Sequence, residues 1–347
     1  MTRPPFPSFP PSDPPFSVKD VTRIQADLYP MGAEINGRKE TRHFIADEHW
    51  EAEIAEKLDL LERDASLRRC IATDDPAGLA EALWRVAALL EKDEPTLWQT
   101  VDGIARLPRH GLRLIVTNDE SRICPEIDAP EATPLGQRIA AWLERQSGVA
   151  RLFDALALTC QEDIVIMRGS DSGPGDAEAL HVCFPSGWDP REKAGRDFTT
   201  IHEPVGDNAR LLGASANVMK ALLTKGPYVR FSFGLSPNPA LDNHPVTRPP
   251  KPPASIWTDP ESAIDRIYVR MERQTTYPMP DLNRGLFTIR VYVDPVKARL
   301  ARDPSLRPRL ASLIETAIPE VRDYKGITEM SPVLLEWLAS FGITTEG

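Results

Sequence analysis

The sequence predicts an α+β fold, with helices in the first half of the chain and a mostly antiparallel sheet in the second. Apolar residues recur at helical spacing up to about residue 150, whereas short apolar runs bounded by turn residues follow from there on. The first pattern is typical of helices and the second of strands. Because helices and strands do not alternate regularly, the order favours α+β over repeated strand–helix–strand units.

Three helices are predicted in the first half, each beginning after a residue that can cap a helix. The caps are Asp47, Asp75 and Thr133, and the last two are each followed by a proline. A capping side chain accepts a hydrogen bond from the first turn, where proline is also tolerated. The apolar residues that would share the buried helix faces are Trp50, Ile54, Leu58, Leu61, Leu79, Leu83, Val86, Leu90, Ile139, Trp142 and Leu143. These helices are expected to form a layer that covers another part of the fold.

The second half of the chain carries the predicted strands. They span residues 164–167, 180–184, 228–235, 264–273 and 286–293. The turn-rich segment from Ser170 to Gly175 joins the first two strands as a hairpin. The other elements expected are a helix at 209–223, a loop with five prolines at 244–253, and closing helices at 306–317 and 332–341.

Four regions follow from these patterns. Residues 1–16 hold seven prolines and three phenylalanines and are expected to form an extended tail. Residues 17–150 are expected to be mainly helical, 151–300 to contain the sheet, and 301–347 to add the C-terminal helices.

Composition and charge exclude several classes of protein. The formal net charge of −10 argues against nucleic-acid binding, which requires a basic face. No apolar run reaches the ~20 residues that span a bilayer, and no apolar signal core begins the chain, so a cytoplasmic protein is expected. The four cysteines show no CxxC spacing, which argues against a zinc site and, in a reducing compartment, against disulfides.

Common cofactor motifs are missing from the sequence. It contains no GxGxxG, Walker loop, HExxH or GxSxG pattern. A nicotinamide or iron–sulfur cofactor, if used, is therefore expected on another chain.

One predicted strand carries polar residues on both faces. Alternation places Arg270, Glu272 and Gln274 on one face and Arg273 on the other. Arg273 and Arg290 have the fork geometry that binds carboxylates, including the propionates of a cofactor. The alternative is a structural ion-pair network through Glu272, and the residues alone leave both open.

Two histidines are candidate metal ligands. His202 stands at the end of a linker just before Pro204, and His181 alternates with Cys183 in a predicted strand. A neutral imidazole is a common axial ligand of haem iron, although a single histidine is more often structural. The histidines of the helical half, His43, His49 and His110, are expected at the surface or at helix caps.

Six ordered segments between residues 160 and 295 resemble the haem-dependent oxidative N-demethylase alpha-subunit family. They are Gln161-Glu162-Asp163, Cys183-Phe184-Pro185-Ser186-x-Trp188, Lys193-x-Gly195, Ile201-His202-x-Pro204-Val205, Arg270-x-Glu272-Arg273-Gln274-Thr275 and Phe287-Thr288-Ile289-Arg290. The sequence differs from the family pattern at Gly206, at Arg230-Phe231-Ser232-Phe233 and at Thr276-Tyr277-Pro278-Met279-Pro280.

The resemblance implies a PAS-like antiparallel sheet that binds haem b, with His202 as the iron ligand. It further implies oxidation of a small amine such as dimethylamine by O2, with release of formaldehyde. Electrons would come from NADPH through a partner reductase subunit that carries flavin and an iron–sulfur cluster.

Roles for other residues follow from the same resemblance. Glu272 or Asp163 would hold an ammonium substrate, and an aromatic wall such as Trp188 or Phe184 would add cation–π attraction. Arg273 and Arg290 would bind the haem propionates or donate a hydrogen bond beside the iron, and His181 is the second candidate ligand. Two alternatives remain: a haem sensor or carrier without turnover, and a related oxygenase acting on a different amine.

Overall fold

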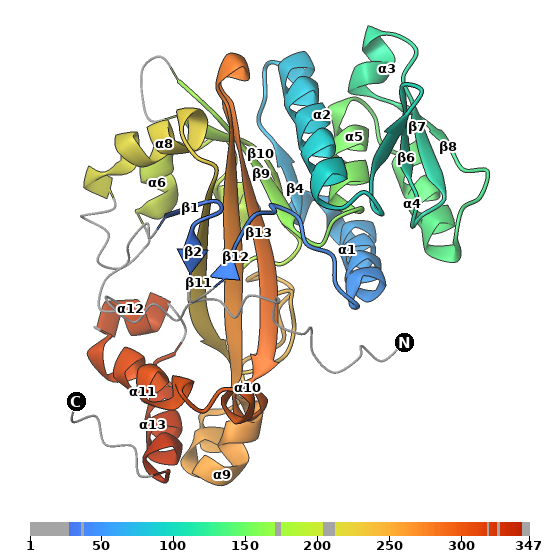
Figure 1. Cartoon of the computed structure of the whole chain (residues 1–347). Coiled ribbons are helices and arrows are strands. Elements are labelled where there is room, and N and C mark those ends of the chain that lie inside the picture. The colour runs from blue at the N-terminus through green and yellow to red at the C-terminus, as the bar shows by residue number, and fades with distance from the viewer. Residues whose placement is uncertain are drawn as a thin grey trace.

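The computed structural model describes residues 28–35, 38–170, 175–203, 212–317, 319–324 and 327–341. Its centre is a seven-stranded sheet with the strand order β1-β11-β12-β13-β9-β10-β4, in which all neighbours are antiparallel. Helices lie on both sides of this sheet, and more helices surround the lower end of its longest strands (Figure 1). The α+β class predicted from the sequence is confirmed.

Five strands from the second half of the chain form the middle of the sheet. Their bounds are β9 Asp163–Arg168, β10 Asp176–His181, β11 Tyr228–Ser236, β12 Tyr268–Met279 and β13 Arg284–Pro295. All five were predicted, but β10 lies four residues earlier than expected and β12 begins after a short 3₁₀ turn at Ile264–Arg266. The β9–β10 hairpin is confirmed, and most of the turn predicted at 170–175 falls outside the described residues.

The two edge strands come from the N-terminal half. β1, Tyr29–Pro30, pairs with β11, and β4, Arg69–Ile71, pairs with β10. Both are too short to give a periodic sequence pattern, so the sequence did not predict them. The sheet is therefore built from segments more than 100 residues apart.

The two faces of the sheet meet different helices. Gly285 of β13 lies against Leu222 of α8, Ser215–Thr224, so closely that an added Cβ would be 2.5 Å from that side chain. Arg290, which has the opposite parity on the same strand, reaches Glu53 of α1, Trp50–Asp64. We call these the α8 face and the α1 face. α6 and α8 lie on one side of the sheet and α1, α2 and α5 on the other (Figure 1).

The helical layer on the α1 face follows the predicted pattern. Its helices are α1, α2 Pro76–Asp93, α4 Pro134–Glu144 and α5 Val149–Ala157. Asp75 accepts a hydrogen bond from Gly78 N and Thr133 accepts one from Gly136 N, as their capping roles require. Asp47 is not the cap of α1. His49 takes that position, and the Asp47 carboxylate binds Arg290 instead.

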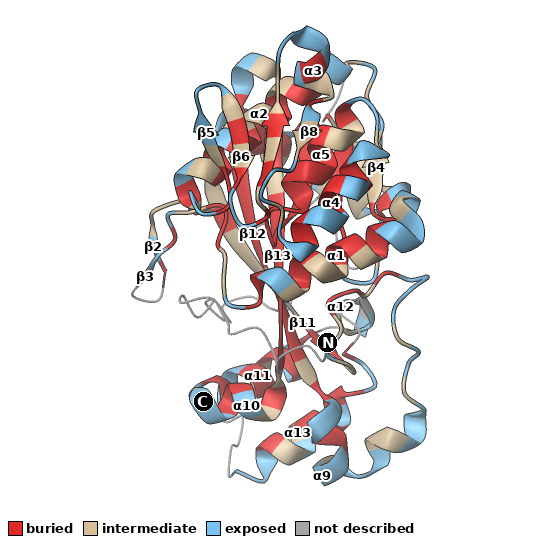
Figure 2. Cartoon of the chain, turned by 90° about the vertical axis from the view of Figure 1, so that its right-hand side faces the viewer, coloured by how far each residue is buried: buried red, intermediate tan, exposed pale blue. Residues whose placement is uncertain are grey.

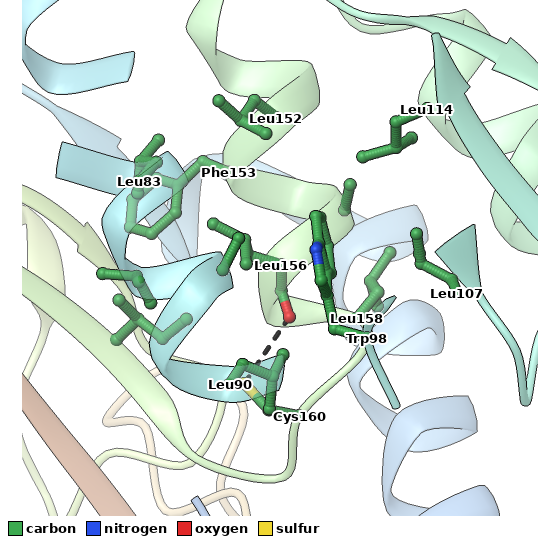
Figure 3. Packing of buried hydrophobic residues seen from close by; sticks show 14 of the residues in the cluster. Leu83, Leu90, Trp98, Leu107, Leu114, Leu152, Phe153, Leu156, Leu158 and Cys160 are labelled. Atoms are coloured by element: carbon green, nitrogen blue, oxygen red, sulfur yellow. Dashed lines mark hydrogen bonds between the residues drawn. The ribbon is translucent and has the colours of Figure 1, made fainter. Parts of the chain in front are cut away.

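The largest apolar core lies between this layer and the sheet. Leu83 and Leu90 of α2, Phe153 of α5 and Trp98 are fully buried in it. Figure 3 shows their side chains packed around Leu156 and Leu158. Burying a side chain of this size contributes about 1.5–3 kcal/mol, so this core holds the helical layer on the sheet.

A second, four-stranded sheet lies within the region expected to be mainly helical. Its order is β5-β6-β7-β8, with bounds Gln99–Val101, Ile104–Leu107, Leu112–Ile115 and Glu126–Asp128. α3, Asp119–Ile123, connects the last two strands. Each strand has only three or four residues, so no alternation was long enough to predict it. A small two-stranded ribbon, β2 Glu34–Ile35 and β3 Arg38–Lys39, completes the N-terminal part.

The C-terminal helices form a separate apolar cluster at the far end of β12 and β13. They are α9 Pro260–Ala263, α10 Val296–Arg302, α11 Leu306–Thr316, α12 Pro319–Tyr324 and α13 Ser331–Ala339. α11 and α13 confirm the two predicted closing helices. In Figure 2 this group lies below the N-terminal layer, and the long strands connect the two.

Two further expectations concern thiols and membranes. The four cysteines are all free. Among the residues that the structure describes, no helix has both the length and the apolar character needed to cross a bilayer.

The histidines of the N-terminal half are buried and not at the surface, but His49 does occupy a helix-cap position, at the start of α1. His43, His49 and His110 are 4%, 5% and 1% exposed. His110 Nε2 donates to Leu158 O at 2.8 Å, and its ring packs on Trp50. Burial lowers the pKa of His110 to about 4.

We expect His110 to make the free energy of unfolding pH-dependent. The unfolded chain protonates this side chain below about pH 6.5 and the folded protein only near pH 4. Its contribution is therefore present above about pH 6.5 and is lost as the pH falls towards 4, by roughly 3 kcal/mol at about 1.4 kcal/mol per pKa unit. Urea unfolding of the protein and of His110→Gln should show a flatter pH dependence for the variant. Parallel curves would contradict the assignment.

Candidate functional site

The α8 face gathers polar side chains from β11 and β12 beside apolar ones from β13. Arg230 pairs directly with Gln274, and Glu272 pairs with Val291, so these side chains share one face. The predicted alternation along β12 is confirmed: Arg273 points to the opposite face, beside Arg290. Arg230 and Glu272 are half-buried, in contrast to the fully buried residues of the α1 face.

His202 is the last residue of α6, Phe198–His202, a short helix capped by Asp197 through Thr200 N. Its Nδ1 lies 2.7 Å from Phe198 O, the carbonyl one turn earlier. A carbonyl can only accept, so Nδ1 carries the proton and donates. In the neutral ring the lone pair is then on Nε2, the tautomer in which a histidine binds a metal.

The surroundings of His202 favour this neutral form. Burial lowers the pKa of His202, and the positive charges of Arg230 and Lys193 act in the same direction. The ring also lies against Phe198, with 4.0 Å between the centroids. A neutral, oriented imidazole on a half-buried helix end is suited to ligate a metal centre.

An apolar wall lies next to this histidine. Ile201 and Trp188 pack on the cluster that includes Val165 and Leu180. Trp188 and Phe287 also contact a second cluster that contains Ile289 and Val291 of β13. These two clusters form a continuous apolar lining along the α8 face.

Asp163 positions the segment that leads to Trp188. Its two carboxylate oxygens accept hydrogen bonds from Cys183 N at 3.0 Å and Phe184 N at 2.9 Å. Lys57 Nζ lies 3.4 Å from the same carboxylate. Asp163 is fully buried, so in the described structure its carboxylate serves the fold of this segment.

Arg270 fixes the other side of that segment. Its guanidinium donates to Phe184 O at 2.9 Å, to Leu241 O at 2.9 Å and to Ser186 Oγ at 2.8 Å. Since the strand β12 carries Arg270, the loop with Trp188 is tied directly to the sheet.

Glu272 is the carboxylate of the α8 face. Ser186 Oγ donates a short hydrogen bond to its Oε1, and Gln274 Nε2 donates to Oε2 at 2.6 Å. Glu272 is half-buried, and both of its oxygens are oriented by neutral donors. No salt bridge to Glu272 is found within the described part of the chain, so its negative charge is available to a cation.

Arg273 and Arg290 lie on the α1 face, buried in ion pairs. Arg273 Nε binds Glu40 at 2.9 Å, and its other nitrogens donate to the carbonyls of Arg42 and His43. Arg290 binds Glu53 and Asp47. The ion-pair network expected from the sequence therefore exists, but its acids come from the N-terminal half and not from Glu272.

His181 also lies on the α1 face and not beside His202. Its Nε2 is 3.1 Å from Asp154 Oδ1, and its ring meets Phe153 edge-on. Burial lowers the pKa of His181. The structure thus brings His202, Glu272 and Trp188 to one face and places Arg273, Arg290 and His181 on the other.

Several residues of these networks were missed by sequence reasoning. Lys57 is fully buried and donates to Glu162 O at 2.7 Å and Cys160 O at 3.2 Å. Burial opposes its charge and is the largest single influence, but Asp163 together with Cys160, Cys183 and Glu162 outweighs it, so the pKa of Lys57 is raised. Glu162 accepts from Ile45 N, and burial raises the pKa of this carboxyl. One indication of this network was visible in the sequence: Lys57 is a charged residue within the apolar pattern of the first predicted helix.

The geometry defines a class: an α+β protein whose antiparallel sheet presents a neutral histidine, an oriented carboxylate and an apolar wall on one face. The family model for haem-dependent oxidative N-demethylase, alpha subunit-like, matches residues 35–335. This covers most of the chain, which therefore belongs to that family. The family resemblance seen in the sequence is confirmed.

The donor set fits haem better than a bare metal ion. Within the described residues, no group of three or more His, Cys, Asp or Glu side chains is arranged to hold an ion. Haem supplies four nitrogen ligands itself and needs only one axial side chain and an apolar slot. His202 is a side chain of the required kind, and Trp188, Phe287 and Ile289 are apolar residues on the same face.

We expect Arg290→Met to destabilise the protein by about 3–5 kcal/mol, because Glu53 and Asp47 lose their buried cation. Arg138→Met is the matched control. Arg138 also bridges two carboxylates, Asp59 and Glu62, but at the surface, where about 1 kcal/mol or less is expected. Urea unfolding measures both, and equal losses would contradict a structural role specific to Arg290.

Proposed function

We propose that this chain is the haem-carrying oxygenase subunit of an oxidative N-demethylase that acts on a small alkylamine such as dimethylamine. The observation that carries the proposal is the Nδ1–H bond from His202 to Phe198 O, which fixes the ring in the tautomer that ligates iron through Nε2. Family membership supports the haem and the oxidative demethylation.

In this proposal haem b would be held on the α8 face of a PAS-like sheet, and His202 would ligate its iron. Trp188, Phe287 and Ile289 would provide apolar contacts to the ring. The propionates would bind Arg230 and Lys193, the two cations that act electrostatically on His202. Arg273 and Arg290 are less well placed, because carboxylates on the other face of the sheet neutralise their charges. Bound haem would supply the reductive activation of O2 and the transfer of one oxygen atom to the substrate.

The chain's own residues bind and orient the amine. Glu272 pairs with the substrate ammonium, since its carboxylate is held in place by Ser186 and Gln274. Trp188 offers an aromatic face to the same cation. The substrate methyl group gains a hydroxyl, and the resulting carbinolamine collapses to the shorter amine and formaldehyde. Two electrons, two protons and O2 are used, and one water is released.

The electrons come from a partner subunit. An alpha subunit implies such a partner, and we propose a reductase that takes electrons from NADPH through flavin and an iron–sulfur cluster. The proposed assembly thus separates the oxygen chemistry on this chain from nucleotide binding on the other.

A different amine substrate is the second candidate. The segments that differ from the family pattern, 230–233 and 276–280, lie on β11 and β12, the strands that carry Arg230 and Glu272. Of these residues, Arg230, Ser232 and Thr276 lie on the α8 face, where they would change the substrate site without altering His202. A haem sensor or carrier without turnover is the remaining alternative, and formaldehyde release separates it from an enzyme.

We expect the purified protein to bind haemin with one strong Soret band and His202→Ala to lose that binding or shift the band. Added imidazole should restore the spectrum, because it replaces the missing ligand. His181→Asn is the control: it should keep the Soret band, since His181 faces Asp154 on the α1 face. The reverse pattern, or a colourless protein that takes up no haemin, would contradict the proposal.

We expect Glu272→Gln to raise KM for dimethylamine at least about tenfold, since a charge-assisted contact is lost, while kcat changes much less. Formaldehyde is measured with a chemical reductant and O2. The exposed Glu261 provides the control, Glu261→Gln, which should leave KM unchanged. Haem binding without formaldehyde from dimethylamine or related amines would support the sensor alternative, and an unchanged KM would remove Glu272 from the substrate site.

A further inference from the structure

A cleft of about 690 Å³ lies on the α1 face, away from His202. Its walls are α2, the end of β12 at Tyr277, and the chain around Met31 and Pro227. This volume lies within the ~300–1,000 Å³ typical of small-molecule sites. None of its lining residues belongs to the proposed haem site.

His43 supplies a buried polar atom that has no partner at this cleft. Its side chain is about nine-tenths or more buried, at 4% exposure, and neither ring nitrogen makes a hydrogen bond within the described residues. Nδ1 lies 3.4 Å from Asp93 Oδ2, so in the neutral ring the proton belongs on Nδ1, the nitrogen that faces the carboxylate. Nε2 is then a buried acceptor, and leaving it unsatisfied costs about 1–3 kcal/mol.

Two aromatic rings flank this acceptor. Tyr277 meets His43 edge-on, with 5.5 Å between the ring centroids. Trp84 is held by a hydrogen bond from its Nε1 to Arg122 O at 2.8 Å and by edge contact with Trp98. These half-buried rings offer fixed surfaces against which a flat molecule can pack.

The charge that stays uncompensated at the cleft is positive and belongs to α2. Trp84, Ala88 and Lys92 follow at four-residue spacing and so share one helix face, with about 12 Å between the first and the last. Arg85 is paired with Asp281, and Arg122 with Glu81. Lys92 is exposed and has no ion pair in the described parts of the chain, although the protein as a whole is acidic.

We propose that this cleft binds a nucleoside monophosphate or a molecule of the same chemistry: a planar heteroaromatic ring with an N–H donor and one anionic group. The ring packs between Trp84 and Tyr277 and donates to His43 Nε2. The ribose passes over the small side chain of Ala88, and the phosphate binds Lys92. The site is independent of the haem on the other face of the sheet.

Isothermal titration of the full chain with adenosine, guanosine and uridine 5′-monophosphates tests this. At least one is expected to bind with Kd below about 1 mM at low salt. Loss of the hydrogen bond in His43→Phe should weaken binding about tenfold. Lys92→Gln should weaken it several-fold and remove the salt dependence, and the matching nucleoside without phosphate should bind the wild type as weakly.

Two further variants keep the test decisive. Ala88→Trp fills the cleft from an exposed position on α2 and should abolish binding even if His43→Phe fails to fold. Lys251→Gln, an exposed lysine outside the cleft, should have no effect. Absence of binding by all three nucleotides would mean that water alone satisfies His43, and binding unchanged in Lys92→Gln and Ala88→Trp would place it elsewhere. Either result overturns the proposal.

Discussion

The buried ion pairs of Arg273 and Arg290 connect the two halves of the chain, and much of the structure depends on them. Both arginines lie on the central hairpin of the sheet, and their acids come from residues 40–53. A buried charge is tolerated only when an opposite charge and hydrogen bonds compensate it. The N-terminal segment therefore has one position on the sheet, and the helices that follow it are placed accordingly.

This arrangement leaves the other face of the same strands for chemistry. Side chains alternate between the two faces along a β-strand. On β12, Arg273 therefore points into the ion-pair network, and its neighbour Glu272 points to the α8 face, where His202 lies. On one face the strand arginines are buried and paired with carboxylates. The other is half-buried, with an oriented carboxylate and an apolar wall, which is what a cofactor site with a polar substrate requires.

Sequence reasoning predicted the parts that are local. The helix caps at Asp75 and Thr133, the five central strands and the alternation of Arg270, Glu272 and Gln274 all follow from residues close together in the chain. The partners of Arg273 and Arg290 are 233 and 237 residues away, and nothing in the local pattern indicates them. The proton position on His202 depends on a five-residue helix, which is too short to predict with certainty from periodicity.

The edge strands have a consequence for how the protein is made. β4 cannot pair until β10 has been synthesised, and β1 cannot pair until β11 has been synthesised. The sheet is therefore complete only after more than half of the chain has left the ribosome. Contacts this distant in sequence are slow to form because a long loop must close first. The sheet-bearing segment, expressed alone, would expose two unpaired edges and aggregate. The N-terminal half of the chain therefore supplies the two edge strands that the sheet-bearing segment lacks.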